Sequence, residues 1–475
     1  MSPLLAYYPQ LSLVRDAFKN CRRRVYLVGG AMRDFYLGRR GRDFDFAVDS
    51  GGKILAQRLA RRLRGAFVLL DREHNSYRVV KKIDGVVWTF DVTDWRGESI
   101  KQDLDLRDFT INALAMDILK DGPDSDILLE AKGSLKDLKA GVVRMIGPKV
   151  FEDDPLRLLR AYALQATLSF KIDAKTLRQI KKDAHLIAGV AAERIREELF
   201  KVLASPRAHE TLSGMDKIGL LPHVIPQITV MYGIKQGGYH HLDVWKHSLE
   251  VIFQLEKTIG DLQGEEHLKL YLNETIGGGH SRLALLKLAA LLHDIGKPET
   301  RRKEKGRMTF HGHEHAGERI TRLVARHLKV SVKERFFLED AVRMHLRPGY
   351  LSNFKRPSEK AVFRFLRDTK DEAAALAILG LADQAATRGP LTTRLKQKHH
   401  AKICHMLIGR YFEAREFKPR QRLLTGHDLI RVLKLKPSAL FGKILQRVEE
   451  AYALGKIKTK QEALALAKNA AIQTS

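Results

Sequence analysis

Residues 27–46 read LVGGAMRDFYLGRRGRDFDF, and this stretch decides the fold that we expect for the first part of the chain. The residues Val25–Val28 are rich in β-formers and predict a short strand. Gly29 and Gly30 follow, and glycine lets the backbone turn sharply and approach a ligand closely. The segment Ala31–Leu37 then predicts one or two turns of helix, so the stretch indicates a strand, a glycine turn and a helix.

The same stretch brings phosphate-binding and metal-binding groups together. Free N–H groups at the start of the helix, together with Arg33, suit a triphosphate. The sequence DFDF alternates polar and apolar residues and predicts a strand, on which Asp43 and Asp45 face the same side. Two carboxylates so placed suit paired Mg²⁺ ions, which can activate a hydroxyl and stabilise a leaving pyrophosphate. Either motif alone also fits an ordinary turn or a solvated strand, but their combination in this order favours a nucleotide site.

The charge of the chain indicates a polyanionic partner. Its 475 residues include 84 Lys and Arg against 56 Asp and Glu, which gives a net charge of +28. Nucleic acid is the default partner of so basic a protein, and the spread of the basic residues favours a broad phosphate-contacting surface. The alternative is a generally basic protein without a polyanionic partner.

The composition also bounds the class and compartment of the protein. Hydrophobic content of 44% and charged content of 29% are typical of a soluble globular protein, with a length that fits three or four domains. No apolar run is long enough to span a bilayer, and the first residues lack a signal pattern. Cys21 and Cys404 lie far apart, so no disulfide framework is expected. We expect a cytoplasmic protein with no membrane partner, and its oligomeric state stays open.

Hydrophobic periodicity predicts an α+β chain. Strands are expected at Phe67–Leu70, Tyr77–Lys81 and Val86–Thr93, with Asp84-Gly85 as the hairpin turn between the last two. From about residue 151 onward the pattern is almost entirely that of amphipathic helices. We therefore expect a small head with a mixed sheet and helices, followed by an all-α body.

Further polar groups follow the first motif along the chain. The strand Phe90-Asp91-Val92 places Asp91 at a possible third position beside the metals. The segment RDFTINA then combines a cation, a carboxylate and an amide, groups that suit phosphate, ribose hydroxyl and base: Arg107, Asp108 and Asn112.

A later helix is predicted to carry groups that read a base. In DDPLRLLRA, Pro155 fits a first helical turn, and Asp153, Arg157 and Arg160 are expected on one face with Asp154 beside Arg157. A carboxylate and an arginine presented together can read the donor and acceptor pattern of a base edge. The following helix ERIREEL, at residues 193–199, fits either the same site or an ion-pair network within the helix.

These five motifs, in this order over residues 27–199, resemble the class II tRNA nucleotidyltransferase and bacterial poly(A) polymerase family. The resemblance implies a polymerase-β-like nucleotidyltransferase head that uses CTP and ATP as substrates and tRNA as partner. It implies Mg²⁺ ligands at Asp43 and Asp45 and, less directly, a third catalytic carboxylate at Asp91. It also implies a nucleotide site made of these residues: Gly29, Gly30, Arg33, Arg107, Asp108, Asn112, Asp154, Arg157 and Arg160.

The chain departs from the family pattern in three places. Leu106 stands where the family has the first Arg of RRDFT, and Asp153 replaces the Glu of EDxxR. Few residues separate Arg96 from Ser99, where full CCA-adding members carry a longer flexible loop. A short loop resembles the CC-adding subgroup. The alternatives are a bacterial poly(A) polymerase, a non-catalytic RNA-binding protein, and a phosphohydrolase whose head only docks RNA.

A second constellation of imidazoles and carboxylates lies further along the chain. Its order of His, His-Asp and Asp, with extra histidines between, resembles the HD phosphohydrolase superfamily: His247, His293, Asp294, His313, His345 and Asp383. Such ligands suit a transition metal, namely Mn, Ni, Co, Fe or Zn. The core motif consists of His247, His293, Asp294 and Asp383. His313 and His345 fit the additional ligands of a two-metal variant. We assign no role to His240, His241, His311 or His315.

The resemblances together predict four parts. Residues 1–148 form the nucleotidyltransferase head, and residues 149–230 form a helical neck that binds nucleotide and RNA. Residues 231–400 form an HD metal phosphohydrolase domain. Residues 401–475 form a helical tail that binds tRNA, although a generic helical cap fits the tail equally well.

Overall fold

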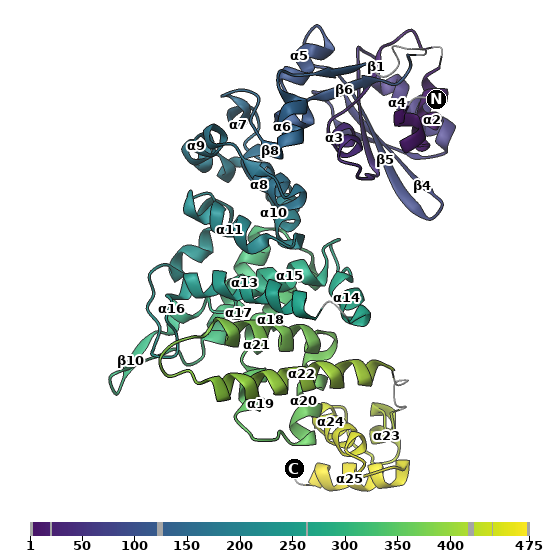
Figure 1. Ribbon diagram of the computed structural model, residues 1–475. Coiled ribbons are helices and arrows are strands. Elements are labelled where there is room, and N and C mark those ends of the chain that lie inside the picture. The colour runs from purple at the N-terminus through teal and green to yellow at the C-terminus, as the bar shows by residue number, and fades with distance from the viewer. Residues whose placement is uncertain are drawn as a thin grey trace. The chain divides into compact units, whose positions relative to one another are not determined.

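The computed structural model describes residues 3–19, 21–120, 127–262, 265–416, 422–438 and 440–472. The chain divides into two compact units, Met1–Val224 and Ile225–Ser475, and each is described by itself. The first unit contains the sheet, and the second is almost entirely helical (Figure 1). The predicted α+β class is confirmed.

A seven-stranded mixed sheet organises the first unit. Its strand order is β3-β4-β5-β2-β1-β6-β7, in which β2 and β5 pair in parallel and the other neighbours are antiparallel. The strands are β1 (Val25–Val28), β2 (Asp43–Val48), β3 (Ala66–Asp71), β4 (Ser76–Ile83), β5 (Val86–Asp94), β6 (Leu114–Asp117) and β7 (Leu128–Glu130). The strands expected from sequence are all present, and Asp84 and Gly85 turn between β4 and β5 with φ values of 50° and 80°.

Helices of the first unit connect and cover these strands. They are α1 (Pro3–Tyr7), α2 (Gln10–Phe18), α3 (Gly30–Tyr36), α4 (Gly52–Leu63), α5 (Ile100–Asp105), the 3₁₀ helix η1 (Thr110–Asn112) and α6 (Ser134–Ala140). The amphipathic helix α4 buries Leu55, Leu59 and Leu63, which recur every four residues on one side. The helix α3 ends before Gly38, whose φ of 66° suits a glycine that stops a helix.

Aromatic packing fills the core beneath β2. Phe44 is 1% exposed, and its ring stacks on Trp88 and Phe90 at centroid distances of 5.7 and 5.6 Å. Tyr8 of the segment after α1 contacts the same ring edge-on at 5.1 Å. Because Phe44 lies between Asp43 and Asp45 on an alternating strand, its burial turns both carboxylates to the opposite face of the sheet.

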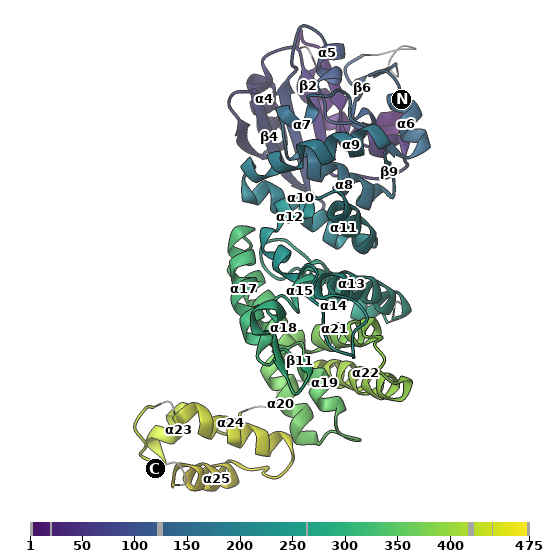
Figure 2. The same cartoon turned by 90° about the vertical axis from the view of Figure 1, so that its left-hand side faces the viewer.

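The rest of the first unit is a group of helices and two short strands. The elements are β8 (Val142–Val143), α7 (Val150–Asp153), α8 (Arg157–Leu168), β9 (Lys171–Ile172), α9 (Ala174–Asp183), η2 (Ala184–Gly189), α10 (Ala192–Ala204), α11 (Ala208–Lys217) and α12 (Leu221–Val224). Helices α8, α10 and α11 pack together (Figure 2).

The expectation of one helix from Asp153 to Arg160 is wrong. Asp153 ends α7, and Asp154 has an extended backbone with φ of −150° before α8 begins at Arg157. The residue before a proline disfavours the helical region, so Pro155 interrupts the helix at Asp154. The two acidic residues therefore do not share a helix face with the arginines.

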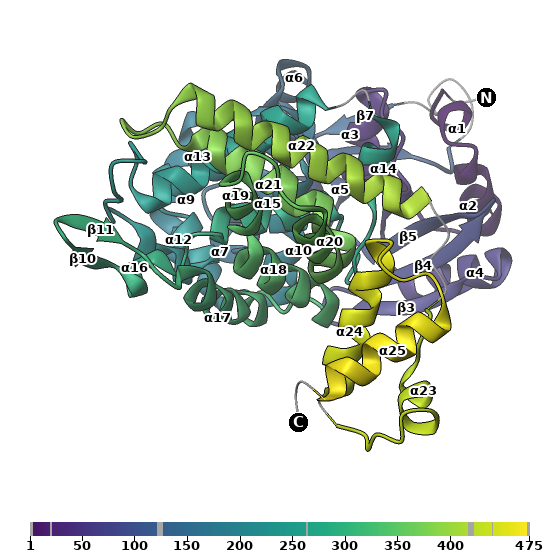
Figure 3. The same ribbon diagram turned by 90° about the horizontal axis from the view of Figure 1, so that it is seen from below.

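The second unit is a bundle of helices with one small hairpin. Its elements are η3 (Pro226–Met231), α13 (Val244–Asp261), α14 (Glu266–Asn273), α15 (Arg282–Leu292), α16 (Lys297–Thr300), β10 (Arg302–Glu304), β11 (Arg307–Thr309), α17 (His313–His327), α18 (Val332–Met344), α19 (Arg347–Ser352), α20 (Glu359–Thr369), η4 (Lys370–Glu372), α21 (Ala373–Ala386) and α22 (Arg394–Glu416). Helices α15 and α21 are buried almost throughout, and the β10–β11 hairpin projects beyond α16 (Figure 3).

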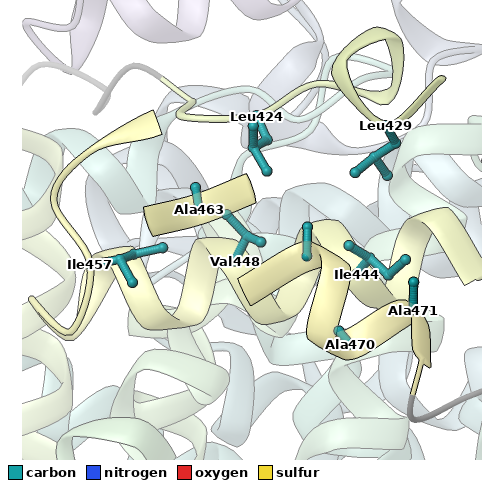
Figure 4. Packing of buried hydrophobic residues seen from close by; sticks show 9 residues of the cluster. Leu424, Leu429, Ile444, Val448, Ile457, Ala463, Ala470 and Ala471 are labelled. Carbon is teal, nitrogen blue, oxygen red and sulfur yellow. The ribbon is translucent and has the colours of Figure 1, made fainter. Parts of the chain in front are cut away.

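Three further helices close the chain: α23 (Gly426–Arg431), α24 (Leu440–Ala453) and α25 (Lys460–Ile472). They build a small core of their own from leucine, isoleucine, valine and alanine side chains, among them Leu429, Ile444 and Ala463 (Figure 4). Over the described ranges of the chain, no helix combines the length and apolar character that crossing a membrane requires.

We expect the substitution F44A to lower the free energy of unfolding of the first unit by about 3–5 kcal/mol, because it leaves a cavity under three aromatic rings. Hydrogen exchange of the β2 and β5 amides in the full chain measures the change for this unit alone. I54A is the control, because Ile54 is 67% exposed and its loss should matter little. Equal effects of the two substitutions would contradict this account of the core.

Candidate functional site

The turn between β1 and α3 brings backbone against side chains of the sheet. Gly29 has φ of 71°, a left-handed conformation that glycine adopts without strain. A Cβ atom there would lie 3.0 Å from Asp45 Oδ2 and 3.3 Å from an Arg107 guanidinium nitrogen. Glycine is therefore required for both the conformation and the close approach.

Three acidic side chains, Asp43, Asp45 and Asp91, form what we call the head carboxylate site. The parallel register of β2 and β5 pairs Asp45 with Asp91, and it pairs Asp43 with Thr89, whose hydroxyl donates to the Asp43 carboxylate. Burial raises the pKa of Asp45, and the negative charges of Asp91 and Asp43 raise it further. An added cation would relieve this crowding.

Asp91 differs from the other two carboxylates in its partner. Arg78 of β4 lies opposite it and donates to both of its oxygens at 2.7 Å. The charge of Asp91 is therefore already balanced by a neighbouring strand, whereas Asp43 accepts from a neutral hydroxyl.

A chain of hydrogen bonds connects α3 to α8. Arg33 donates to Asn112 Oδ1 at 2.7 Å, and Asn112 donates to Asp108 Oδ1 at 3.0 Å. Arg160 of α8 lies 3.0 Å from Asp108 Oδ2. Burial opposes ionisation of Asp108, but Arg160 and the hydrogen bonds outweigh it and lower its pKa. Asp108 thus orients the arginine and the amide rather than facing open solvent.

Arg107 is held on the other side of the glycine turn. Its guanidinium donates twice to Asp103 Oδ2, at 3.1 and 2.9 Å, and Arg96 donates to the other oxygen through its backbone N–H at 3.1 Å. Burial raises the pKa of Asp103, but the two arginines outweigh burial and the pKa falls below its usual value. The sequence pattern did not single out Asp103 or Arg96.

Two cavities meet at the head carboxylate site. One, of about 290 Å³, is lined by both β2 carboxylates and by cations of α3, α8 and α10, including Arg33, Arg160 and Lys201. The other, of about 340 Å³, is lined by Asp45, Arg96 and Arg107 among others. Acidic and basic groups therefore face the same space, as a metal-bound triphosphate requires.

The two residues predicted to read a base have different surroundings. Asp154 Oδ2 lies 2.9 Å from the Arg194 guanidinium of α10, and Asp154 Oδ1 accepts from the Leu156 N–H. Arg157 donates to the Val150 carbonyl at 3.2 Å, and burial lowers its pKa. Neither is among the described residues that line the two cavities. Arg194, in the motif ERIREEL, pairs with Asp154 and was not among the predicted site residues.

The second unit brings all six predicted histidine and aspartate residues together, and we call them the histidine centre. They come from the start of α13, the end of α15, the start of α17, the end of α18 and the end of α21: His247, His293 and Asp294, His313, His345, and Asp383. Two triads within it could each hold a metal ion: His247, His293 and Asp294, and Asp294, His313 and His345. Within each triad the ligand atoms all lie within 4.8 Å of one another.

Asp294 belongs to both triads. Its Oδ2 is 3.1 Å from His293 Nε2 and 3.7 Å from His247 Nε2, while its Oδ1 is 3.4 Å from His313 Nε2 and 3.9 Å from His345 Nε2. Each oxygen thus faces one pair of imidazoles. These residues would hold one or more metal ions, with Asp294 available as a ligand to either pair of imidazoles.

Backbone carbonyls orient three of the imidazoles. The Nδ1 atoms of His293, His313 and His345 lie 2.6–2.8 Å from the carbonyls of the residues three positions earlier, which leaves Nε2 turned to the centre. Burial lowers the pKa of His345 to about 3, which keeps that ring neutral, as a metal ligand must be.

Other polar residues around the centre separate into two groups. Lys297 donates to Asp294 Oδ2 at 2.6 Å and to Gln236 at 2.6 Å, and its position three residues after Asp294 was the signal that could have found it. The His240 ring lies 4.7 Å from that of His247. His311 and His315 are exposed and contact glutamates, outside the centre.

Comparisons with known families match the chain in four segments. The poly(A) polymerase head domain matches residues 25–144, and the family described as "Probable RNA and SrmB- binding site of polymerase A" matches residues 169–231. The HD domain matches residues 244–387, and the second domain of tRNA nucleotidyltransferases matches residues 373–467.

Two similar proteins align with nearly the whole chain. An A-adding tRNA nucleotidyltransferase of Deinococcus radiodurans is 33% identical over 94% of this chain and 96% of its own. A CC-adding tRNA nucleotidyltransferase of Thermus thermophilus is 33% identical over 93% of this chain and 92% of its own.

Solved structures share the fold at lower identity. A structure titled "tRNA-processing enzyme (apo form I)" is 23% identical, covers 91% of this chain and 96% of its own, and has a TM-score of 0.60. A CCA-adding enzyme of Thermotoga maritima complexed with tRNA is 19% identical, covers 100% of this chain and 97% of its own, and has a TM-score of 0.56. From these full-length relatives and matched domains, the chain belongs to the tRNA nucleotidyltransferase family, with an HD domain in its second unit.

Proposed function

We propose that this enzyme extends the 3′ end of tRNA with nucleotides from CTP or ATP, and that the head carboxylate site performs the transfer. The observation that carries the proposal is the placement of Asp43 and Asp45 on one face of β2, in the same cavity as Arg33 and Arg160. In this reaction the oxygen of the terminal 3′ hydroxyl loses its proton and forms a bond to the α-phosphorus of the nucleotide. The bond between that phosphorus and the pyrophosphate oxygen breaks, and pyrophosphate leaves.

The residues fit Mg²⁺ as the cofactor of this site. Asp43 and Asp45 offer only oxygen atoms, the ligands that Mg²⁺ prefers, and Asp45 is crowded by like charge. When bound, the metal supplies charge stabilisation for the attacking and leaving oxygens. We propose that Asp91, which Arg78 already neutralises, acts by setting the electrostatics of Asp45.

The surrounding groups have separate roles in this proposal. Arg33 and the N-terminus of α3 hold the triphosphate, next to the Gly29-Gly30 turn. Asp108 and Asn112 keep Arg33 and Arg160 directed at the cavity. The Lys and Arg side chains that give the chain its +28 net charge contact the tRNA phosphates. Asp154 and Arg157 read the base, and Arg194 fixes Asp154 in position.

The nucleotide preference that we propose is CC, with no terminal A. The segment between β5 and α5 consists of Trp95–Ser99 alone, and full CCA-adding members carry a longer loop there. The two 33% identical relatives are one A-adding and one CC-adding enzyme, so similarity does not separate these activities. The proposal therefore rests on the length of this segment.

We propose that the histidine centre is a separate phosphohydrolase site, which holds a transition metal such as Mn, Ni, Co, Fe or Zn. Imidazole Nε2 atoms turned inward around the Asp294 carboxylate fit such a metal. When bound, the metal lowers the pKa of water and supplies hydroxide for phosphoester hydrolysis. Lys297 donates to Asp294 and partly balances its charge.

We expect D43N and D45N to reduce nucleotide addition by at least about a hundredfold, because each weakens binding of the metal ion that would stabilise the reacting oxygens. Single-turnover addition of radiolabelled CMP to tRNA measures the loss, and tRNA binding should be unchanged. D91N is the matched variant, with a smaller expected loss because Arg78 balances that carboxylate. Near wild-type addition by D43N or D45N would reject the assigned site.

The nucleotide preference is tested with two tRNA substrates. We expect tRNA that ends at the discriminator base to gain two C residues from CTP, and tRNA that ends in CC to gain nothing from ATP alone. Sequencing of the 3′ ends reads both results. Efficient addition of one A to the CC end would reject the CC preference, and long A tails on arbitrary RNA would instead identify a poly(A) polymerase.

We expect the double substitution H293A/D294A to abolish hydrolysis of phosphomonoesters and 2′,3′-cyclic nucleotides in the presence of Mn, Ni or Co, while nucleotide addition continues. The two activities should separate because their ligand sets are different and lie in different units. H311A is the control, since His311 is exposed and lies outside the centre. Absence of hydrolysis by the wild-type enzyme with all three metals would give the centre a structural role only.

A further inference from the structure

The β10–β11 hairpin is the most basic short segment of the second unit that the proposed chemistry leaves unused. Residues 301–309 read RRKEKGRMT, with five cations and one acidic residue. Residues 301–307 are exposed, and the hairpin projects away from the helices beside α16 (Figure 3).

The hairpin is a paired two-stranded ribbon with a tight turn. Its strands pair Arg302 with Thr309 and Glu304 with Arg307, and the turn consists of Lys305 and Gly306 with φ of 47° and 76°. These two residues with positive φ form the tight turn that matches the twist of a two-stranded ribbon. Such a ribbon has little stability by itself in water, and like charges on it repel one another.

Four cations of the ribbon have no acidic partner among the residues that the structure describes. Among the residues that the structure describes, neither a hydrogen bond nor an ion pair engages the side chains of Arg302, Lys303, Lys305 or Arg307. The one acidic residue, Glu304, lies 3.9 Å from exposed His311. No large apolar side chain of the segment is exposed, so the surface lacks an anchor for a membrane or an apolar protein face. A phosphate chain suits these cations.

Both ends of the hairpin are fastened to the histidine centre. Before it, Lys297 of α16 donates to Asp294 Oδ2 at 2.6 Å, and its ammonium lies 5.7 Å from the Phe310 ring. After it, the Phe310 carbonyl lies 2.8 Å from His313 Nδ1. The cations therefore lie in the chain between Lys297 and Phe310, which contact two residues of the centre.

We propose that the hairpin binds the phosphate backbone of a single-stranded RNA end and thereby makes a polynucleotide, rather than a free mononucleotide, the substrate of the histidine centre. This inference rests on the proposed phosphohydrolase function. Hydrolysis of a terminal phosphomonoester adds one water across the P–O bond and releases the RNA hydroxyl and inorganic phosphate, with no further reactant. The phosphates behind the end then contact the cations of the ribbon.

The test uses the full chain loaded with Mn²⁺ and two hairpin variants. R302A/K303A/K305A/R307A removes the four cations, whereas R302K/K303R/K305R/R307K keeps every charge and exchanges the side chains. Each enzyme is assayed on an oligoribonucleotide with a 3′-phosphate and on p-nitrophenyl phosphate, which has no further phosphate to contact the ribbon.

We expect the neutral variant to lose kcat/KM on the oligoribonucleotide alone, while the charge-retaining variant behaves as wild type on both substrates. The plot of log(kcat/KM) against log salt has a negative slope, to which each phosphate contact on a single strand contributes about 0.7 in magnitude. Removal of four contacts should therefore make the slope shallower by about 3. A change in slope of this size means that raising salt from 50 to 200 mM lowers kcat/KM of the wild type about 50-fold more than that of the neutral variant.

Other outcomes would overturn the inference in distinguishable ways. Equal losses on both substrates would make the hairpin a structural support of the centre, and no loss on either would leave it without a role in substrate binding. Salt-dependent binding to vesicles of anionic lipid that only the neutral variant loses, with RNA hydrolysis unchanged, would assign it to a membrane surface.

A catalysis-independent measurement separates this inference from the phosphohydrolase proposal. If the wild-type enzyme hydrolyses neither substrate, the proposed function fails. Acylation of Lys303 and Lys305 with and without the oligoribonucleotide still measures whether RNA covers the hairpin. Protection of both lysines supports RNA binding there, and unchanged acylation rejects it. Lys333, an exposed lysine of α18, is the internal control.

Discussion

The parallel pairing of β2 with β5 is the constraint on which the head depends. It places Asp45 beside Asp91 in register, with Asp43 two residues away on the same face. Burial raises the pKa of Asp45 and the nearby like charges raise it further, and these charges would destabilise the fold unless cations balance them. Arg78 balances Asp91 from β4, and Arg107 approaches Asp45 across the glycine turn. The remaining unbalanced charge is what a bound metal would neutralise.

Local patterns predicted much of this arrangement, because strand alternation and glycine conformation depend on neighbouring residues. The side on which Asp43 and Asp45 lie follows from burial of Phe44 between them. The contacts of Arg78 with Asp91 and of Arg194 with Asp154 join different elements, so spacing along the chain could not reveal them. The break at Asp154 was missed although Pro155 signalled it, because the helical pattern of the later residues was extended one turn too far.

The histidine centre was predictable for a different reason. Its ligands stand at helix ends, where His293 and Asp294 close the apolar helix α15 and the order of the other ligands follows a family pattern. The sequence could not predict which residues of the centre contact one another. Only the fold shows that the two oxygens of Asp294 face different imidazole pairs and that Lys297 competes for one of them. Metal binding at that oxygen therefore has to displace or share the lysine.

The contacts of Asp154 also bear on why a short segment after β5 would favour one base. To present a different hydrogen-bond pattern, Asp154 has to leave both the Arg194 guanidinium and the Leu156 N–H, and an exposed ion pair of this kind contributes about 0.2–1 kcal/mol. A mobile loop that binds the incoming nucleotide can offset such a cost, and Trp95–Ser99 offers few residues to do so. The ion pair with Arg194 is one of the two contacts that hold the Asp154 carboxylate in its present orientation.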